Sequence, residues 1–248
     1  MRCSAIGEDL YEYQFEPESG KPYGFNLYVL TAGRRALLID TAYETQAADV
    51  WAALQSMGYS LGVVLVSHFH PDHVSGLAVL PKATVWGSEH YLLTLGEPRF
   101  ESGELFPPVE ALRDGSSRRF GSFRLSFRAA PGHTPCSLYT IIDRGTVHVA
   151  DNLMAANDGT PILPWAPFDA VEAHIRSLEA LKALTPEVLL LAHGRRIEGG
   201  AAINREIEDR LSYLRAVQDG HGECSVEEAT ADCSRRFLCE HWHIRRTS

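Results

Sequence analysis

A short apolar run that ends in a cluster of imidazole and carboxylate groups limits the folds open to this chain. Residues Gly62 to Val66 read Gly-Val-Val-Leu-Val, and the next seven residues read Ser-His-Phe-His-Pro-Asp-His. A wholly apolar, β-branched run of this length predicts a strand that is buried on both faces of a sheet. The polar cluster then follows at the end of that strand, which favours a layered α/β fold with a polar site at one edge of a sheet.

The polar cluster itself predicts a metal site. It places His68, His70, Asp72 and His73 within six residues. Neutral imidazoles and carboxylates are the ligands that suit zinc and similar divalent ions. The alternative is a polar loop in which Asp72 caps the following helix. Asp72 alone would fit that alternative, but four such groups together favour the metal site.

Three later segments share the same local form, a polar residue at the end of an apolar strand. His133 follows a predicted strand over residues 123–128, Asp151 follows residues 147–150, and His193 follows residues 188–192. Each of them alone is more typical of a hydrogen-bonded structural residue. Because a sheet brings the ends of its strands to one rim, the set predicts that all three join the cluster at 68–73.

The remaining pattern predicts strands and helices in two successive runs. The expected strands cover residues 25–30, 36–39, 62–66, 83–86, 123–128, 137–142, 146–150 and 187–191. The expected helices cover residues 45–57, 88–95, 168–184, 203–217 and 226–238, and residues 96–121 are expected to form a long surface connection. No linker separates these segments. The pattern predicts one domain over residues 1–248, with C-terminal helices from about residue 200, built as two sheets sandwiched between helices.

Charge and composition exclude several classes of function. The formal net charge of −9 argues against a nucleic-acid-binding surface, which usually shows as a basic excess, and short pairs such as Arg195–Arg196 and Arg245–Arg246 are more typical of solvated surface. No stretch approaches the roughly 18 apolar residues that span a bilayer. The first residues show no secretory pattern, and the five cysteines are odd in number. We therefore expect a cytoplasmic protein with a small-molecule substrate and neither nucleic acid nor membrane as partner.

The ordered motifs resemble those of the metallo-β-lactamase-fold superfamily. They are Asp40 after the second strand, His-x-His-x-Asp-His at 68–73, Gly-His-Thr-Pro at 132–135, the strand-end Asp151, and His193-Gly194. The resemblance runs from roughly residue 25 to 195. It implies an αββα four-layer sandwich, with one metal held by His68, His70 and His133 and a second held by Asp72, His73 and His193. Asp151 would bridge the two metals, and Asp40 would orient the metal-binding loop by hydrogen bonds.

The resemblance also implies a reaction. Two divalent ions, zinc in first place with iron or manganese as alternatives, would share a hydroxide that attacks a carbonyl, with Asp72 and Asp151 as catalytic residues. The leading interpretation is a hydrolase of the glyoxalase II-like branch that cleaves a small thioester, ester or lactone. The second is a sulfur dioxygenase with one iron, acting on a glutathione persulfide. A non-enzymatic binding role is disfavoured because no ligand has been lost.

The substrate is less constrained than the metals. Tyr23, Met154, Trp165 and Phe168 are candidates for an apolar substrate pocket, although aromatic residues in such loops more often serve packing. Arg195 is a candidate to meet a substrate carboxylate. No cysteine occupies a second-site ligand position, which weakens the β-lactamase interpretation, and Met154 stands where lactonases of the family carry Tyr.

Two features stay open at this stage. Cys136 follows the His-Thr-Pro motif and is expected to be a small buried side chain, with a redox-sensitive thiol as the alternative. Cys239, His241 and His243 are spaced like ligands, but they lie outside the family pattern and are taken as a feature of the tail. The helices after residue 200 would either cover the site or form a homodimer interface.

Overall fold

The computed structural model describes residues 1–95, 110–143 and 145–246. Its strands form two sheets, a seven-stranded sheet in the order β1 to β7 and a six-stranded sheet in the order β13-β12-β11-β10-β9-β8. The first sheet consists of β1 (Arg2–Gly7), β2 (Leu10–Gln14), β3 (Asn26–Ala32), β4 (Arg35–Ile39), β5 (Ser60–Leu65), β6 (Thr84–Ser88) and β7 (Glu110–Leu112). The second consists of β8 (Ser117–Phe120), β9 (Phe123–Ala129), β10 (Leu138–Ile142), β11 (Thr146–His148), β12 (Val188–Leu190) and β13 (Ile197–Glu198).

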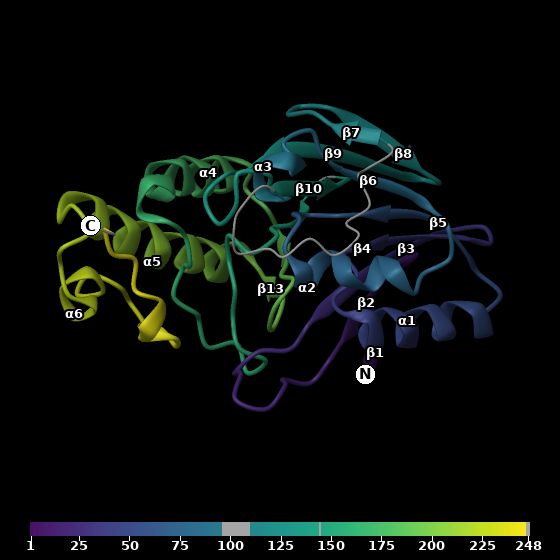
Figure 1. The fold of residues 1–248 in the computed structure, drawn as a ribbon, viewed down its shortest axis with the longest axis horizontal. Coiled ribbons are helices and arrows are strands. Elements are labelled where there is room, and N and C mark those ends of the chain that lie inside the picture. The colour runs from purple at the N-terminus through teal and green to yellow at the C-terminus, as the bar shows by residue number, and fades with distance from the viewer. Residues whose placement is uncertain (96–109, 144, 247–248) are drawn as a thin grey trace.

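Helices lie on the outer sides of the two sheets. They are α1 (Glu44–Ser56), α2 (Pro71–Val74), α3 (Tyr91–Leu95), α4 (Val171–Ala183), α5 (Gly200–Asp219) and α6 (Val226–Ala229), with 3₁₀ turns η1 (Ser75–Ala78), η2 (Phe168–Ala170) and η3 (Glu240–Trp242). Figure 1 shows α1 on one side of the molecule, next to the first sheet, and α4 and α5 on the opposite side. None of the helices in the described ranges combines the length and the apolar character that crossing a bilayer requires.

Alternating side chains create the layers. In β3, Leu27 and Val29 pack toward α1, together with Val50 of that helix. The intervening Tyr28 and Leu30 point the other way, into the space between the two sheets. Successive strand residues point to opposite faces, so a strand that is apolar throughout must be covered on both sides.

The second sheet repeats this arrangement. Leu125 and Phe127 of β9 join the layer between the sheets. On its outer face, Leu189 of β12 packs with Leu178 of α4 and Ile207 of α5. Three apolar layers thus separate four layers of secondary structure, and the predicted αββα sandwich is confirmed.

Three segments differ from the sequence-based expectations. The strands β1 and β2 were not predicted, and the end of the expected surface connection at 96–121 forms β7 and β8. These strands carry little apolar alternation, and they form because their backbones pair with neighbouring strands: β1 with β2, β2 with β3, β7 with β6 and β8 with β9. The part of that connection over residues 96–109 lies outside the described residues.

The last predicted helix, over residues 226–238, was wrong in its length. Helix α6 starts with a capping box between Ser225 and Glu228, and it ends at Ala229. Beyond it, Asp209 of α5 accepts a hydrogen bond from the backbone of Ser234 (2.7 Å), and Leu238 donates its N–H to Pro161 (2.9 Å). These contacts outside the segment take the backbone groups that a longer helix would need.

One edge of the sandwich collects the strand ends that carry the predicted ligands. Strands β4 and β5 are parallel, as are β11 and β12, so the carboxyl ends of each pair meet at one edge. The two sheets are joined there, because the N–H of Asn26 donates to Ala192 (2.8 Å) and the N–H of Leu138 donates to Ser67 (2.9 Å). The fold therefore brings residues from both halves of the chain to one place.

Candidate metal centre

The His-x-His-x-Asp-His segment leaves β5 and turns at once into α2. His70 precedes the helix in an extended conformation, with φ −75° and ψ 152°, and Pro71 occupies the first helical position. Proline is favoured there because its fixed φ suits a helix start. The turn reverses the chain between His68 and His73, so side chains on both sides of Pro71 face the same space.

A first group consists of His68, His70 and His133. One ring nitrogen from each lies within 4.8 Å of the others. The shortest separation is 3.0 Å, between His133 Nε2 and His70 Nδ1. All three imidazoles are buried. His133, which lies 60 positions along the chain from the motif, is therefore brought to it as the sequence predicted.

A second group consists of Asp72, His73 and His193. Asp72 Oδ2 lies 3.5 Å from His193 Nε2, and Asp72 Oδ1 lies 3.9 Å from His73 Nε2. Both imidazoles are buried, whereas the Asp72 side chain keeps 26% of its exposure. This group thus has one open side, formed by a carboxylate.

Asp151 lies between the two groups. Its Oδ2 is 3.6 Å from His133 Nε2 and 3.9 Å from His68 Nε2 on one side. On the other side it is 3.4 Å from both His73 Nε2 and His193 Nε2. A single carboxylate oxygen within reach of both groups is the geometry that a bridging ligand needs.

The ring nitrogens turned away from this centre are held by protein acceptors. His133 Nδ1 is 3.0 Å from the carbonyl oxygen of Trp165, and His193 Nδ1 is 3.1 Å from that of Gly24. Such bonds fix the orientation of each ring, so that the opposite Nε2 faces the centre. The imidazoles are therefore oriented before any ion binds.

Asp40 performs the same task for His73. Its Oδ2 is 2.9 Å from His73 Nδ1 and accepts a hydrogen bond from Ser67 Oγ (2.7 Å), while its Oδ1 accepts one from the Ser67 N–H (2.7 Å). The carboxylate is buried. Asp40 thus fixes both the start of the motif and one of its imidazoles, without facing the centre itself.

The buried carboxylates and neutral imidazoles of the centre favour a bound cation. Burial lowers the pKa of His68 well below its usual value, and it lowers the pKa of His70 to about 2, so both are neutral. Burial also acts against charge on His193, but Asp151 and Asp72 outweigh it and raise the pKa of His193 to about 9. The buried carboxylates hold a proton on this imidazole, a place that a divalent cation would fill.

The residues present fit a pair of divalent ions. In tetrahedral coordination with Zn–N and Zn–O distances of about 2.0–2.1 Å, neighbouring ligand atoms lie ~3.4 Å apart. The separations here run from 3.0 to 3.9 Å. In addition, the Nε2 atoms of His68, His73 and His193 and Asp151 Oδ1 are buried without a hydrogen-bond partner among the described residues. Buried polar atoms are rarely left so, which indicates a missing ligand.

A cavity of about 300 Å³ opens onto the centre. Tyr23, Met154 and Trp165 line it together with His70, Asp72, His133 and Asp151, and so does Trp242, which the sequence analysis did not single out. Trp242 lies in η3, outside the family motifs, so no motif signal pointed to it. Tyr23, Met154 and Trp165 thus line a cavity beside the ligand residues, and their role in binding a substrate stays a prediction.

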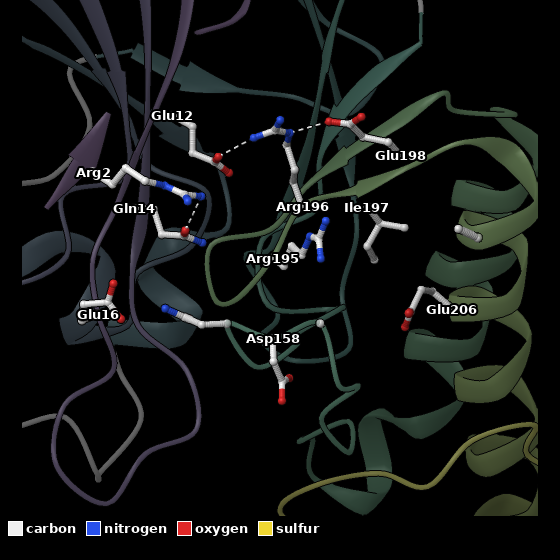
Figure 2. Close-up of a pocket in the computed structure, with 13 residues that line it drawn as sticks. Arg2, Glu12, Gln14, Glu16, Asp158, Arg195, Arg196, Ile197, Glu198 and Glu206 are labelled. Carbon is white, nitrogen blue, oxygen red and sulfur yellow. Dashed lines mark hydrogen bonds and ion pairs between the residues drawn. The ribbon is translucent and has the colours of Figure 1, made fainter. Parts of the chain in front are cut away.

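Phe168 and Arg195 line other cavities. Phe168 lies beside Trp165 in a second cavity, where its ring packs against Gly222. Arg195 lines a polar cavity on the surface, together with Arg196, which spans Glu12 and Glu198 (Figure 2). The turn at Gly194 has φ 87° and directs the chain away from the metal centre after His193. The expectation that these two residues line the substrate pocket is corrected accordingly.

The remaining candidates lie apart from the centre. Cys136 is buried, and its sulfur accepts a hydrogen bond from Thr94 Oγ1 (2.9 Å). His243 bonds to Tyr213 Oη (3.1 Å) and to the carbonyl of Cys224 (2.8 Å), and within the described ranges Cys239, His241 and His243 form no converging ligand group. A residue that the sequence analysis missed is His148, a buried imidazole 3.8 Å from Asp40 Oδ2.

The chain is similar in sequence to two groups of enzymes. The human mitochondrial persulfide dioxygenase ETHE1 is 30% identical over 127 residues, which cover 51% of this chain and 46% of that protein. The hydroxyacylglutathione hydrolase of Brucella anthropi is 29% identical over 196 residues, which cover 77% of this chain and 69% of that protein. The chain thus spans about half the length of the dioxygenases it matches.

Solved structures and a family model agree on the fold. A metallo-beta-lactamase family protein from Thermus thermophilus superimposes with a TM-score of 0.67 at 21% identity, over 87% of this chain and 82% of that one. The model of the metallo-beta-lactamase superfamily matches residues 21–193, the span that holds both sheets' ligand-bearing ends. The chain therefore belongs to the metallo-β-lactamase superfamily.

Proposed function

We propose that this protein is a hydrolase that binds two divalent metal ions, zinc in first place, and cleaves a small thioester, ester or lactone. The observation that carries the proposal is Asp151 Oδ2, which lies within 3.4–3.9 Å of imidazole nitrogens from both ligand groups. His68, His70 and His133 would hold one ion, Asp72, His73 and His193 the other, and Asp151 would bridge them. When bound, such a pair would lower the pKa of a water held at the centre toward about 7.

The residues of the chain supply the positioning. Asp151 Oδ1 is buried without a hydrogen-bond partner among the described residues, so it can accept a proton from a water held at the centre. Asp72 borders the cavity and is partly exposed, which lets it pass a proton to the leaving group or to solvent. Asp72 and Asp151 are therefore the proposed catalytic carboxylates.

Metal analysis and a substrate panel test this proposal. The purified protein is expected to contain about two zinc ions per chain and to hydrolyse members of a panel of thioesters, esters and lactones, with β-lactams and phosphodiesters as comparison. Asp151→Ala and His68→Ala are expected to abolish hydrolysis. Unchanged hydrolysis by either variant, in folded and metal-analysed protein, would disprove the mechanism.

A second candidate function is persulfide dioxygenation. It is favoured by the similarity to the human persulfide dioxygenase and by a further convergent group, His68, His73 and Asp151. Two imidazoles and one carboxylate are the ligand set of many non-haem iron oxygenases. One iron per chain, with oxygen uptake on glutathione persulfide and no hydrolysis, would favour this candidate over the hydrolase.

A further inference from the structure

We infer that Trp242, with Tyr23 and Trp165, forms an apolar pocket that selects substrates with an uncharged, apolar acyl group. This inference rests on the proposed hydrolase function and names its substrate class. Trp242 is the specificity-determining residue, and it comes from the C-terminal segment beyond the residues that the family model matches.

Each ligand group has an aromatic ring of the cavity lining beside it. The ring centroid of Tyr23 lies 5.0 Å from that of His193, and the ring of Trp165 lies 5.3 Å from that of His133. Trp242 contacts Tyr23 edge-on, with centroids 6.0 Å apart. A carbonyl placed over the centre therefore has aromatic surface on both sides, and its substituent has Trp242 as a further wall.

Among the described residues, the lining of this cavity offers no cationic side chain to a charged acyl group. Apart from the ligand residues, the described residues that line it are Tyr23, Pro71, Met154, Trp165 and Trp242. No lysine or arginine is among these residues, and a buried carboxylate without a partner is strongly disfavoured. The acyl group that fits is neutral.

Size limits the group further. The cavity holds about 300 Å³, at the lower end of the range of about 300–1,000 Å³ for small-molecule sites. Flat aromatic walls favour a ring or a short branched chain over a long flexible one. A phenylacetyl group meets both conditions, whereas a succinyl group has a similar length and a charge.

Hydrogen bonds on both sides of Trp242 hold it in place. On one side, Leu238 donates its N–H to Pro161 and accepts from the N–H of Leu163, at 2.9 and 3.0 Å. On the other side, the buried His243 bonds to Tyr213 Oη and to the carbonyl of Cys224. A wall fixed in this way loses little conformational entropy when a ligand binds.

The network on α5 supports both walls of the cavity. Arg210 is fully buried, and its Nη2 donates to the carbonyl oxygen of Met154 (2.6 Å). Arg235 of the C-terminal segment bonds to Asp209 (3.0 Å) and Glu206 of the same helix. One helix thus positions Met154 and the segment that carries Trp242 relative to each other.

Kinetics with a matched series of acyl groups test the inference. Thioesters with one leaving group and acetyl, phenylacetyl or succinyl acyl groups are compared on the zinc-loaded protein. The wild type is expected to prefer phenylacetyl over succinyl in kcat/KM. Trp242→Ala is expected to lower kcat/KM for phenylacetyl roughly 10-fold relative to acetyl, as the loss of apolar contact in a pocket does.

Three further variants keep this test interpretable. Trp242→Phe retains an aromatic wall and is expected to retain the preference, while Trp242→Leu retains apolar volume and covers the case in which alanine prevents folding. Phe168→Leu removes an aromatic ring from the neighbouring cavity, which shares Trp165 and Trp242 with this one. It is expected to leave the acyl preference unchanged.

Binding measurements separate this inference from the proposed function. Thioether analogues, in which a methylene replaces the carbonyl, cannot be hydrolysed. Calorimetry is expected to show that the benzyl analogue binds the wild type more tightly than the carboxymethyl analogue, and that Trp242→Leu loses this difference. The same result in a protein that hydrolyses no ester would contradict the proposed function alone. Equal binding of both analogues, or an acyl preference that Trp242→Ala and Trp242→Leu leave intact, would overturn the inference.

Discussion

Three non-glycine residues next to the metal centre have left-handed backbone conformations. Asp40, Ala42 and Ala150 have φ values of 57°, 50° and 49°. Such conformations cost on the order of 1–3 kcal/mol each and persist where the surroundings enforce them. Asp40 itself orients His73, and Ala150 directly precedes Asp151. The strained conformations therefore occur where side chains must have a defined orientation.

Asp40→Asn tests how much the orientation of His73 contributes to metal affinity. The amide would replace a carboxylate that accepts from Ser67 Oγ and lies 2.9 Å from His73 Nδ1. Loss of one such partner lowers metal affinity by about 10- to 100-fold in comparable sites. We expect this loss to fall on the ion held by Asp72, His73 and His193, as measured by zinc titration. Asp49→Asn, an exposed change on α1, is the control, and equal zinc affinity in both variants would contradict the assigned role of Asp40.

Gly194→Ala tests the turn that follows the last ligand. A Cβ at this position would lie 1.8 Å from the carbonyl oxygen of Ala155, and the residue has φ 87°. We expect a loss of at least about 2 kcal/mol in unfolding free energy, together with weaker metal binding, because His193 must shift with the backbone. Gly199→Ala is the matched control, since it has the same φ of 87° and open space around the added carbon. Denaturant unfolding compares the two, and equal losses would show that backbone strain alone accounts for the effect.

Helix α5 links the second sheet to the C-terminal segment. Its inward face is apolar, with Ile203, Ile207 and Leu214 packed against the second sheet and α4. The same helix carries Glu206 and Arg210, both buried and paired with each other at 2.6 Å. A buried ion pair adds little to stability when intact, but it strongly destabilises the fold when one partner is removed.

Glu206→Gln should therefore destabilise the protein in a pH-dependent way. Burial acts to raise the pKa of Glu206, but Arg210 and Arg235 outweigh it and hold the pKa below its usual value. The stabilisation is then present above the unfolded-state pKa of about 4.3 and is lost as the pH falls through the lower folded-state value. We expect the variant to lose about 3 kcal/mol at pH 7. This deficit should shrink toward pH 3 in urea unfolding experiments.

Glu208→Gln, two residues along α5, is the control for that experiment. Glu208 pairs with Lys182 on the surface, and its side chain is 45% exposed. Exposed pairs contribute about 0–1 kcal/mol, so this variant should stay close to the wild type at every pH. A deficit for Glu206→Gln that stays constant between pH 7 and pH 3 would contradict the pKa shift.

The sequence predicted the four layers of the molecule and the sheet edge at which polar side chains lie. The αββα sandwich was predictable because strands such as β3 and β5 are apolar on both faces, which leaves them no exposed side. The positions of His133, Asp151 and His193 were predictable because each follows a predicted strand. Local sequence could not predict β1, β7 or β8, because these strands lie at the edges of the sheets and carry little apolar alternation of their own.

The residues that line the cavity beside the metal ligands were harder to predict than the ligands themselves. Arg195 follows a ligand directly, yet the turn at Gly194 sends it to another surface. Trp242 is 49 positions beyond His193, and it reaches the cavity because the hydrogen bond that Leu238 donates to Pro161 and the one between His243 and Tyr213 hold the residues on either side of it. Tertiary contacts of this kind leave no periodic or motif signal in the sequence.

The position of the centre at the junction of the sheets predicts how metal affects the whole protein. The first sheet supplies the segment from His68 to His73, and the second supplies His133, Asp151 and His193. A bound ion therefore ties the two sheets together, and unfolding must release it. At free zinc 1,000-fold above the dissociation constant, this linkage adds about 4 kcal/mol, which for a chain of this size raises Tm by roughly 10 °C.

Calorimetry of zinc-loaded and chelator-treated protein measures this difference. Magnesium should give a much smaller shift, because it prefers oxygen ligands and the centre offers five imidazoles and two carboxylates. His133→Ala should lose a large part of the zinc-dependent shift, whereas His90→Ala, an exposed imidazole outside the centre, should keep it. If chelation left Tm unchanged in protein shown to have contained zinc, the bound ions would not stabilise the contact between the two sheets. The protein's own residues would then hold the sheets together, and this prediction would be wrong.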